Sequence, residues 1–526
     1  MRLVLATAQG GPHEKYICLS HCWGQAKTLK TTKTSLSEHL RLIKWRRIPS
    51  TYRETIAVAR FLGVRYVWID SLCIVQDDED DWVRESQAMA GIYQNAYLTV
   101  VASSSRDANG GLFPRARGRE RYVTGTRAGG EAYSFIATDA LDVAHPAPAS
   151  HTGGLQDNWP ALTRAWIFQE RLLSPRVVHF AHPEMMWECN GGPPHCECGG
   201  LRDRLHKGSY TAALQDGSAG ELDRVWRGVV EGYSGLSLTY PKDKLPALSG
   251  VARQMASRRP GATYLAGLWS DSLEDDLFWV QRDAQDPSKW RRTRPDAWRA
   301  PSWSWASVDG PVLFPMNDTS QGEVRRLFRV ESGRCSLASS DPTGQVADGT
   351  IVVHGSLDEG RLSMEHSCFR VQLGHDSHSY SSNFRHGSRR LYLDDQLDPS
   401  GRGELVLSDV PATTTVPVKC LRMALQIRTH SLVQYSMVLY RTEDGVYKRI
   451  GMLRRYEETT RSRRPMRVKE EAVDLFEMFF CPETVTGFIE KQDRLEAARR
   501  DIEREDQWDV AALPASPELL DTITIR

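Results

Sequence analysis

The sequence predicts an α/β fold with a doubly wound parallel sheet, followed by a helical segment and a β-rich C-terminal domain. Two observations predict this organisation. Over the first 110 residues, short apolar runs alternate with helical patterns at the spacing of strand–helix–strand units. After about residue 325, short β-type runs separated by Gly, Asp, Ser and Pro replace that pattern. We therefore expect three domains, over residues 1–200, 201–315 and 316–526.

In the N-terminal domain, three apolar runs predict buried strands over residues 16–20, 65–70 and 97–102. Two Ser/Thr-x-x-Glu patterns, at Ser35 and Thr51, are typical of capping boxes and predict helices to residues 43 and 62. A loop over 71–80 and a helix over 81–94 complete the alternation. The carboxyl ends of the predicted strands should share one edge of the sheet, where open α/β proteins bind their ligands.

Further along the chain, helical and strand patterns are less regular. Residues 103–160 predict a long loop with one short strand near Phe135, and residues 199–220 predict a polar linker. Trp303 and Trp305 alternate, which predicts a strand with both rings on one side. The other expected elements are a helix over 163–173, a strand over 177–180, helices over 221–233, 242–255 and 269–280, strands over 351–354 and 436–440, and a charged helix over 489–505.

Composition excludes several classes of protein. Lys+Arg and Asp+Glu both number 67, so no global basic field attracts nucleic acid, although the Arg-rich stretch 115–127 could form a local patch. No apolar run reaches the roughly 18 residues that a membrane span needs. Ten scattered cysteines and the lack of a signal peptide favour reduced thiols in the cytoplasm. P-loop, dinucleotide GxGxxG, kinase and GxSxG motifs are absent.

Five segments in a fixed order give the chain a likeness to a known family. They are YICLSHCWG (16–24), the block from YVWIDSLCIVQDDEDDW onward (66–103), RAWIFQERLLSPRVVHF (164–180), DKLPALSGVA (243–252) and APSWSWASVDG (300–310). The chain resembles fungal heterokaryon-incompatibility (HET) domain proteins over roughly residues 2–315. Such proteins are expected to carry more residues ahead of the first strand than the fifteen found here, which leaves open that an N-terminal piece is absent.

The resemblance implies a function. HET-domain proteins act in filamentous fungi in non-self recognition, a form of innate immunity, where fusion of unlike cells triggers programmed cell death. The HET domain resembles TIR domains, which have a flavodoxin-like fold, and many TIR domains hydrolyse NAD. The resemblance therefore implies NAD as a substrate, with no other cofactor required.

One carboxylate is the candidate catalytic group. The 81–94 helix places Glu85 inside an apolar arc, where a carboxylate must be paired, neutralised or used. In TIR domains the catalytic glutamate follows a Trp, and the resemblance assigns these roles to Trp82 and Glu85. The spacing here is Trp-x-x-Glu, one residue shorter than the TIR pattern. Two interpretations stay open: Glu85 stabilises the cationic ribose as nicotinamide leaves, or it pairs with Arg60 or Arg84.

Polar and aromatic residues follow the first two strands, where they could bind NAD. Trp23 offers a stacking face, Gly24 permits close backbone approach, and carboxylates could bind ribose hydroxyls. The alternative is that these residues pack in the core and satisfy turns. The candidate binding residues are Ser20, Trp23, Gly24, Asp70, Ser71, Asp77 and Trp82.

Two other clusters favour structural roles. Cys189, His195, Cys196 and Cys198 are dense enough to suggest zinc, but their spacing matches no ordinary zinc knuckle, so we expect free thiols. The Gln-Glu-Arg run 169–171 is expected to bridge a helix to the sheet.

Two functions follow from these observations. In the first, the chain is a TIR-like effector that consumes NAD when activated. In the second, the α/β domain is a non-catalytic module that self-associates or binds a recognition partner.

Overall fold

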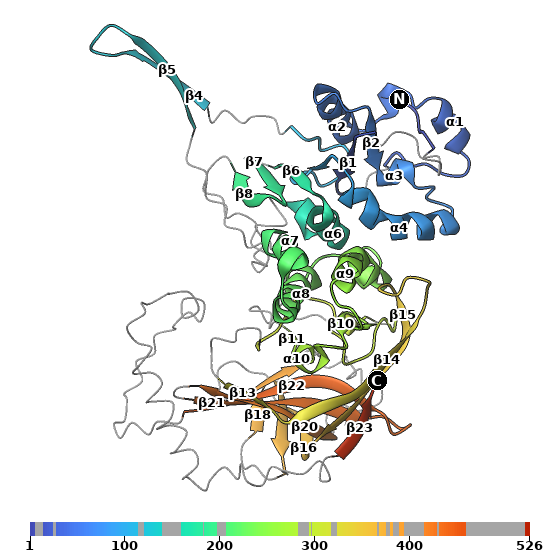
Figure 1. Cartoon of the computed structure of the whole chain (residues 1–526), viewed down its shortest axis with the longest axis vertical. Helices are drawn as coiled ribbons and strands as arrows, with labels where there is room; N and C mark the ends of the chain where they lie inside the picture. Colours follow the sequence, from blue (N-terminus) through green and yellow to red (C-terminus); the bar gives the residue numbers. More distant parts are fainter. Residues whose placement is uncertain are drawn as a thin grey trace. The chain divides into compact units, whose positions relative to one another are not determined.

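The computed structural model describes sixteen stretches of the chain: residues 1–5, 14–24, 28–113, 120–138, 159–181, 184–196, 207–281, 294–295, 297–316, 323–365, 368–374, 379–381, 389–393, 415–428, 431–458 and 521–526. These stretches form two compact units (Figure 1). Unit 1 comprises Met1–Ser272, Gly310–Val312 and Ser336–Ala347; unit 2 comprises Leu273–Asp309, Leu313–Cys335 and Asp348–Arg526.

A mixed six-stranded sheet in the order β2-β1-β3-β6-β7-β8 organises unit 1. Its strands are β1 (Tyr16–Ser20), β2 (Tyr66–Ile69), β3 (Leu98–Val101), β6 (Arg176–Phe180), β7 (Met185–Cys189) and β8 (Gly192–Cys196). The first four are parallel, as the strand–helix alternation predicts. β7 and β8 are antiparallel additions, so the prediction of a wholly parallel sheet is wrong at this side.

Burial explains why β1 is central. Ile17, Cys18 and Leu19 are all almost completely buried, because helices and neighbouring strands cover both faces of this strand. Leu19 lies opposite Ile69 of β2 in the parallel register. The residues that follow the two strands therefore begin at the same edge of the sheet.

Seven helical segments surround the first part of the sheet. They are α1 (Leu36–Arg41), η1 (Trp45–Arg47), α2 (Ser50–Phe61), α3 (Asp70–Cys73), α4 (Glu79–Gln94) and α6 (Ala165–Leu173), the last preceded by η2 (Pro160–Thr163). The predicted loop over 71–80 is wrong at its start, because α3 follows β2 directly. Among the described helices of the chain, none is both long enough and apolar enough to cross a membrane.

The two predicted capping boxes are wrong. Neither α1 nor α2 has a side-chain cap at its N-terminus. The Ser35 hydroxyl instead accepts from Thr32 N–H at 2.9 Å. The Glu54 carboxylate accepts from the backbone N–H groups of Leu112 and Phe113, so it anchors the segment after β3. A capping box does form elsewhere, between Ser218 and Glu221.

The rest of unit 1 is mainly helical. Its elements are the antiparallel hairpin β4 (Glu120–Thr126) and β5 (Ala132–Thr138), α7 (Lys207–Asp216), α8 (Ala219–Ser234), η3 (Pro241–Lys244), η4 (Pro246–Leu248), α9 (Ser249–Ala256), β9 (Tyr264–Leu265) and β10 (Leu268–Trp269). Helix α7 contradicts the polar linker predicted over residues 199–220. The prediction of a loop with one strand over residues 103–160 did not include β4. The predicted helix 269–280 is also wrong, since only α10 (Leu273–Asp276) is helical there.

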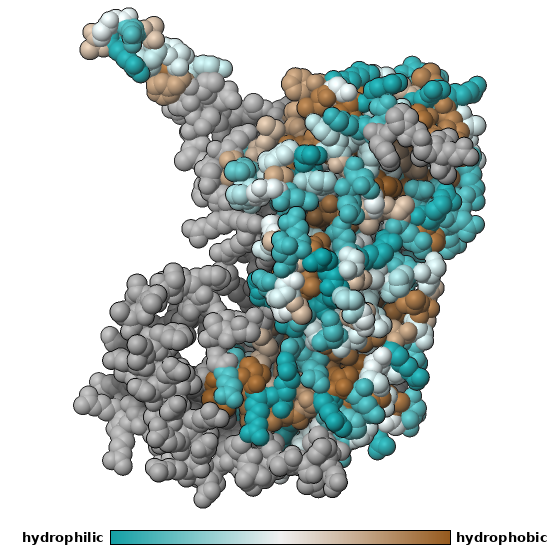
Figure 2. Space-filling model, in the orientation of Figure 1, coloured by the Kyte–Doolittle hydropathy of each residue, from teal (hydrophilic) through white to brown (hydrophobic). Residues whose placement is uncertain are grey.

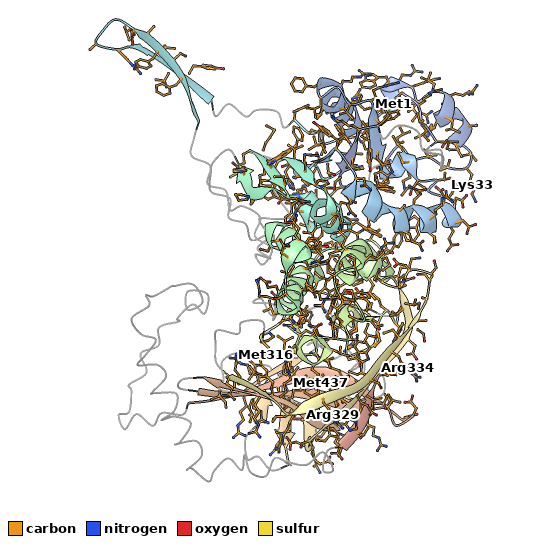
Figure 3. The ribbon with its side chains drawn as sticks, viewed as in Figure 1. Met1, Lys33, Met316, Arg329, Arg334 and Met437 are labelled. Atoms are coloured by element: carbon orange, nitrogen blue, oxygen red, sulfur yellow. The ribbon has the colours of Figure 1, made fainter. Side chains whose placement is uncertain are left out.

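Unit 2 is β-rich, as predicted. Its elements after α10 are β11 (Val280–Gln281), η6 (Trp305–Ser307), β12 (Val312–Leu313, shared with unit 1), β13 (Glu323–Arg326), β14 (Phe328–Leu337), β15 (Val346–Gly355), β16 (Leu357–Glu365), β17 (Cys368–Leu373), β18 (Ser379–Ser381), β19 (Arg389–Leu393), β20 (Val416–Arg428), β21 (Ser431–Arg441), β22 (Tyr447–Glu458) and β23 (Asp521–Ile525). Eleven of these strands form one sheet. Arg329 and Arg334 extend from β14 (Figure 3). The predicted 489–505 helix lies outside the described residues.

A buried arginine organises the core of unit 2. The Arg449 guanidinium lies 3.6 Å from the centre of the Trp279 ring and donates to Leu277 O at 2.8 Å. Trp303 and Trp305 are completely buried in the same unit. The predicted strand through these two residues is wrong, because a tight turn and η6 occupy this segment.

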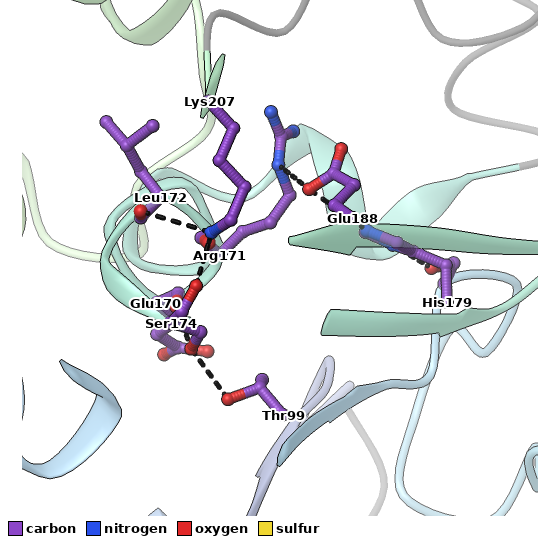
Figure 4. A network of polar contacts seen from close by, with 9 residues as sticks. Thr99, Glu170, Arg171, Leu172, Ser174, His179, Glu188 and Lys207 are labelled. Atoms are coloured by element: carbon purple, nitrogen blue, oxygen red, sulfur yellow. Dashed lines mark hydrogen bonds and ion pairs between the residues drawn. The ribbon is translucent and has the colours of Figure 1, made fainter. Parts of the chain in front are cut away.

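A polar network in unit 1 fixes helix α6 to the sheet (Figure 4). Arg171 of α6 forms an ion pair of 3.0 Å with Glu188 of β7, and both side chains are buried. The Arg171 guanidinium and His179 lower the pKa of Glu188 to about 2 despite its burial. Ser174 Oγ donates to Glu170 O and also contacts Thr99 of β3 at 2.6 Å. The predicted bridging role of the 169–171 run is thus confirmed at Arg171.

Lys207 completes this network at the end of α6. Its ammonium group donates to Arg171 O at 2.6 Å, to Leu172 O at 3.2 Å and to Ser174 O. A cation is favoured there by the unpaired carbonyls and the helix dipole. Burial lowers the pKa of Lys207 to about 8. The first residue of α7 therefore holds the C-terminus of α6 in place.

Lys207→Met tests this role. The substitution keeps the length of the side chain but leaves three buried carbonyls without their donor, so we expect the free energy of unfolding to fall by about 3 kcal/mol. Denaturant unfolding measures it. The control is Lys33→Met, since Lys33 is exposed and its 3.5 Å ion pair with Asp78 is at the surface (Figure 3). Equal midpoints for both variants would contradict the role of Lys207.

Candidate functional site

Two acidic residues, Asp70 and Glu170, lie near the carboxyl ends of β1 and β2. Ser20 ends β1, and Asp70 follows β2 as the first residue of α3. Helix α6 carries Glu170 to the same edge, where Ser20 Oγ donates to Glu170 Oε2 at 2.5 Å. The Tyr93 hydroxyl of α4 donates to Leu19 O at 3.3 Å, and a hydrogen bond from Tyr93 also lowers the pKa of Glu170. Four separate elements thus contribute to one polar cluster, and we call Ser20, Asp70, Tyr93 and Glu170 the carboxylate centre.

Burial perturbs both acids of the carboxylate centre. Burial, together with the nearby charge of Asp70, raises the pKa of Glu170 to about 8. Burial also raises the pKa of Asp70 to about 6, although its hydrogen bonds from Trp23 and Ser71 oppose the shift. At pH 7, Glu170 is therefore mostly protonated while Asp70 is mostly ionised. Two carboxyl groups with separated pKa values are the arrangement in which one acts as acid and the other as base.

Asp70 is held firmly. Trp23 Nε1 donates to Asp70 Oδ2 at 2.7 Å, and Ser71 N–H donates to Asp70 Oδ1 at 2.6 Å. The Lys30 ammonium lies 4.9 Å from the centre of the Trp23 ring and lowers the pKa of Asp70. The indole N–H of Trp23 therefore orients the Asp70 carboxylate. The sequence predicts only that the face of this ring stacks on a ligand.

A chain of hydroxyl and imidazole groups lies beneath Asp70. His21 Nε2 is 3.0 Å from the Tyr52 hydroxyl, which is 2.8 Å from Ser71 Oγ. Burial lowers the pKa of His21 to about 3, so this imidazole is neutral. The chain connects the segment after β1 to α2 and α3, and it fixes the backbone that donates to Asp70.

Glu85, the predicted catalytic residue, lies on α4 with about a quarter of its side chain exposed. Its Oε1 forms an ion pair of 3.4 Å with Arg84 Nε, one of the two arginines that the second interpretation named. Trp82, on the same helix, is half-buried. Asp77 is exposed and accepts from Lys33 N–H at 2.7 Å. The structure thus joins Trp23, Asp70 and Ser71 in one hydrogen-bonded network and pairs Ser20 with Glu170, while Asp77 and Glu85 form their contacts elsewhere.

Gly24 has a structural requirement for glycine. Its φ is +72°, and a Cβ atom there would lie 2.3 Å from the Cβ of Asp107. The segment after β3 therefore packs closely against Gly24. A side chain at position 24 would clash with that segment.

The predicted cysteine and histidine cluster lies on the β7–β8 hairpin. Cys189 pairs with Gly192 beside the turn, whereas Cys196 pairs with Met186 toward the other end of the hairpin. His195 is exposed, and Cys198 lies outside the described residues. In the part of the chain that the structure describes, no group of three or more His, Cys, Asp or Glu residues could hold a metal ion.

Glu170 is the functional candidate that sequence reasoning passed over, since it was assigned only a bridging role. A signal was present: Glu170 and Arg171 interrupt the apolar helix AWIFQERLL, and both are buried. Each must therefore have a partner. The partner of Arg171 is Glu188, whereas Glu170 accepts from the Ser20 hydroxyl and lies near the charge of Asp70.

Comparison with known proteins gives one match. Residues 16–170 match the family model described as Heterokaryon incompatibility protein (HET), and the matched region contains the whole carboxylate centre. No curated protein and no solved structure matches the chain. A domain of this kind implies a role in heterokaryon incompatibility. Over residues 16–170, the chain is therefore similar to the heterokaryon incompatibility (HET) family.

Proposed function

We propose that this chain is a cytoplasmic effector of heterokaryon incompatibility that causes cell death by hydrolysing NAD at the carboxylate centre. The observation that carries the proposal is the pair of the half-buried Asp70 and the buried Glu170, two acids whose pKa values, about 6 and about 8, assign them different protonation states at pH 7. Both lie at the edge of the parallel strands, where α/β folds bind ligands.

The proposed chemistry cleaves the bond between nicotinamide and the ribose C1′. As this bond breaks, its electron pair leaves with neutral nicotinamide and positive charge develops on the ribose. The ionised Asp70 stabilises that charge. Water then adds to C1′ and releases a proton, giving ADP-ribose, nicotinamide and H⁺. Because nicotinamide is a good leaving group, the protonated Glu170 serves to orient Ser20 and the substrate hydroxyls.

The strand order supports a TIR-like relationship for this domain. The four parallel strands follow the order β2-β1-β3-β6, which corresponds to the first four positions of the flavodoxin-like order 2-1-3-4-5. In this proposal Glu170 and Asp70 replace Glu85 as the reactive acids, because the charge of Glu85 is already paired with Arg84.

A second function is favoured by a different observation. Ser20 is only 1% exposed and Glu170 only 5% exposed, so little of either side chain reaches solvent in this conformation. In the second function, the carboxylate centre joins β1 to α6 and stabilises a domain that self-associates or binds a recognition partner without catalysis.

Stability should depend on pH through Glu170. The pKa of this residue is about 8 in the folded chain, against 4.5 for an ordinary glutamate, so between these values the folded state holds a proton that the unfolded state has released. Its contribution to stability is complete below pH 4.5 and is lost as pH rises through 8. Asp70 acts in the same direction between 3.8 and about 6.

Glu170→Gln should remove the larger part of this dependence. We expect its melting temperature, relative to that of the wild-type chain, to rise by more than about 5 °C between pH 5 and pH 8. Thermal unfolding at matched ionic strength measures the difference. The control is Glu85→Gln on the same unit. A Glu170→Gln difference that stays constant over this pH range would show that Glu170 is already ionised.

Nicotinamide release from NAD tests the catalytic proposal. With concentrated full-length protein, we expect Asp70→Asn to lower the rate at least about 100-fold, because it removes the charge that stabilises the ribose cation. Glu170→Gln should lower the rate less, because its amide can still hydrogen-bond Ser20. Glu85→Gln should keep the rate within about threefold of wild type, because Glu85 is paired with Arg84.

The same variants separate the two functions in a cell-viability assay. Full activity in Asp70→Asn would eliminate the proposed mechanism. Death that persists in cells with Asp70→Asn and Glu170→Gln, without NAD loss, would support the non-catalytic module instead.

A further inference from the structure

A strongly basic stretch lies on unit 1, in a chain whose net charge is zero. Residues 41–65 contain seven Arg or Lys residues and one acid, Glu54. That acid does not offset the positive charge at the surface, because its carboxylate is turned to the backbone N–H groups of Leu112 and Phe113. The neighbouring Glu38 is committed to an ion pair of 3.0 Å with Arg47. Of the six other basic side chains of this stretch, Arg53 is half-buried and five face solvent, at positions 41, 44, 46, 60 and 65.

Large apolar side chains are exposed in the same stretch. Phe61 is 89% exposed at the end of α2, and Trp45 is 46% exposed at the start of η1. Leu42 and Leu62 are exposed beside them. The inward positions of the stretch are already filled by a packed core cluster that contains Ile43, Ile48, Ile56, Ala59 and Val64. The exposed apolar residues of this stretch are therefore not part of the packed core.

One contact joins the two ends of this stretch in space. The Arg60 guanidinium of α2 lies 5.4 Å from the centre of the Trp45 ring of η1. Over α1 and α2, Figure 2 shows hydrophobic side chains at the surface beside strongly hydrophilic ones. We call Leu42, Lys44, Trp45, Arg46, Arg60, Phe61 and Leu62 the basic apolar face.

We propose that the basic apolar face binds the surface of an anionic lipid bilayer. Arg and Lys side chains attract acidic headgroups, while Trp, Phe and Leu side chains insert into the boundary between headgroups and acyl chains. This combination of charge and aliphatic exposure fits lipid better than nucleic acid. A nucleic-acid surface would use the basic groups and Trp45 for phosphates and stacking, but it would leave Leu42 and Leu62 in water.

The carboxylate centre is separate from this face. Its acids follow β1 and β2 or lie on α6, whereas the face is formed by η1 and the ends of α1 and α2. Lipid binding is therefore independent of NAD hydrolysis and can be measured without it.

Vesicle flotation with the full-length chain tests the proposal. The probes are phosphatidylcholine vesicles with and without about 30% phosphatidylserine, at low and high salt. We expect binding only to the anionic vesicles, weakened by salt. Two double variants, Phe61→Ser with Leu62→Ser and Lys44→Glu with Arg46→Glu, should each lower the affinity at least about tenfold.

The controls change other exposed residues of unit 1. Tyr240→Ser removes an exposed ring, and Arg224→Glu with Lys242→Glu reverses two exposed charges, so both should stay within about twofold of wild type. Circular dichroism verifies folding, and either face variant suffices if the other fails to fold.

Three results would overturn the proposal. The first is a lack of wild-type binding to anionic vesicles. The second is equal loss of binding in the control variants. The third is that the face variants leave vesicle binding intact but abolish binding to a duplex oligonucleotide, or change the oligomeric state measured by light scattering.

Discussion

The hydrogen bond between Ser20 and Glu170 is the interaction on which the architecture of the HET region depends. It connects the end of the central strand β1 to helix α6, although 150 positions separate the two residues in the chain. A carboxyl group buried at this depth is tolerable because it holds a proton and meets hydroxyl donors. The fold therefore keeps one acid neutral at physiological pH and places a second, ionised acid nearby.

Two different solutions to charge burial lie on adjacent residues of α6. Arg171 has a full ionic partner in Glu188, whose pKa falls to about 2. Among the described residues no cation pairs with Glu170, and its pKa rises to about 8. The first arrangement is typical of a structural ion pair, whereas the second keeps a carboxyl group in its protonated, hydrogen-bonding form. The contrast is a physical reason to place Glu170, and not Arg171, in the proposed site.

The interior and the surface of unit 1 contain two separate groups of residues, each with its own proposed function. The carboxylate centre is formed by side chains that face inward from β1, α3, α4 and α6. The basic apolar face is formed by side chains that point outward from η1 and the end of α2. If an effector acts from a membrane surface, the first set serves chemistry and the second serves location.

The sequence alone indicated the likeness to the HET family, the parallel strands β1, β2 and β3, and most of the residues around Asp70. Apolar runs and their spacing are local properties, so they can be read without coordinates. The sequence-based prediction failed where contacts with distant residues outweighed a local pattern. Glu54 fits a capping box but binds the segment after β3. Trp303 and Trp305 alternate like strand residues but pack in a turn.

Only the tertiary structure showed which acid lies at the carboxyl end of β1. On a helical wheel, Glu85 looks buried and available, yet Arg84 pairs with it. Glu170 looks like one part of a bridging run, yet it lies against Ser20 and beside the charge of Asp70. The physical reason is that the pKa of a carboxyl group depends on burial and on charges within a few ångströms, and those neighbours come from strands and helices far apart in the chain.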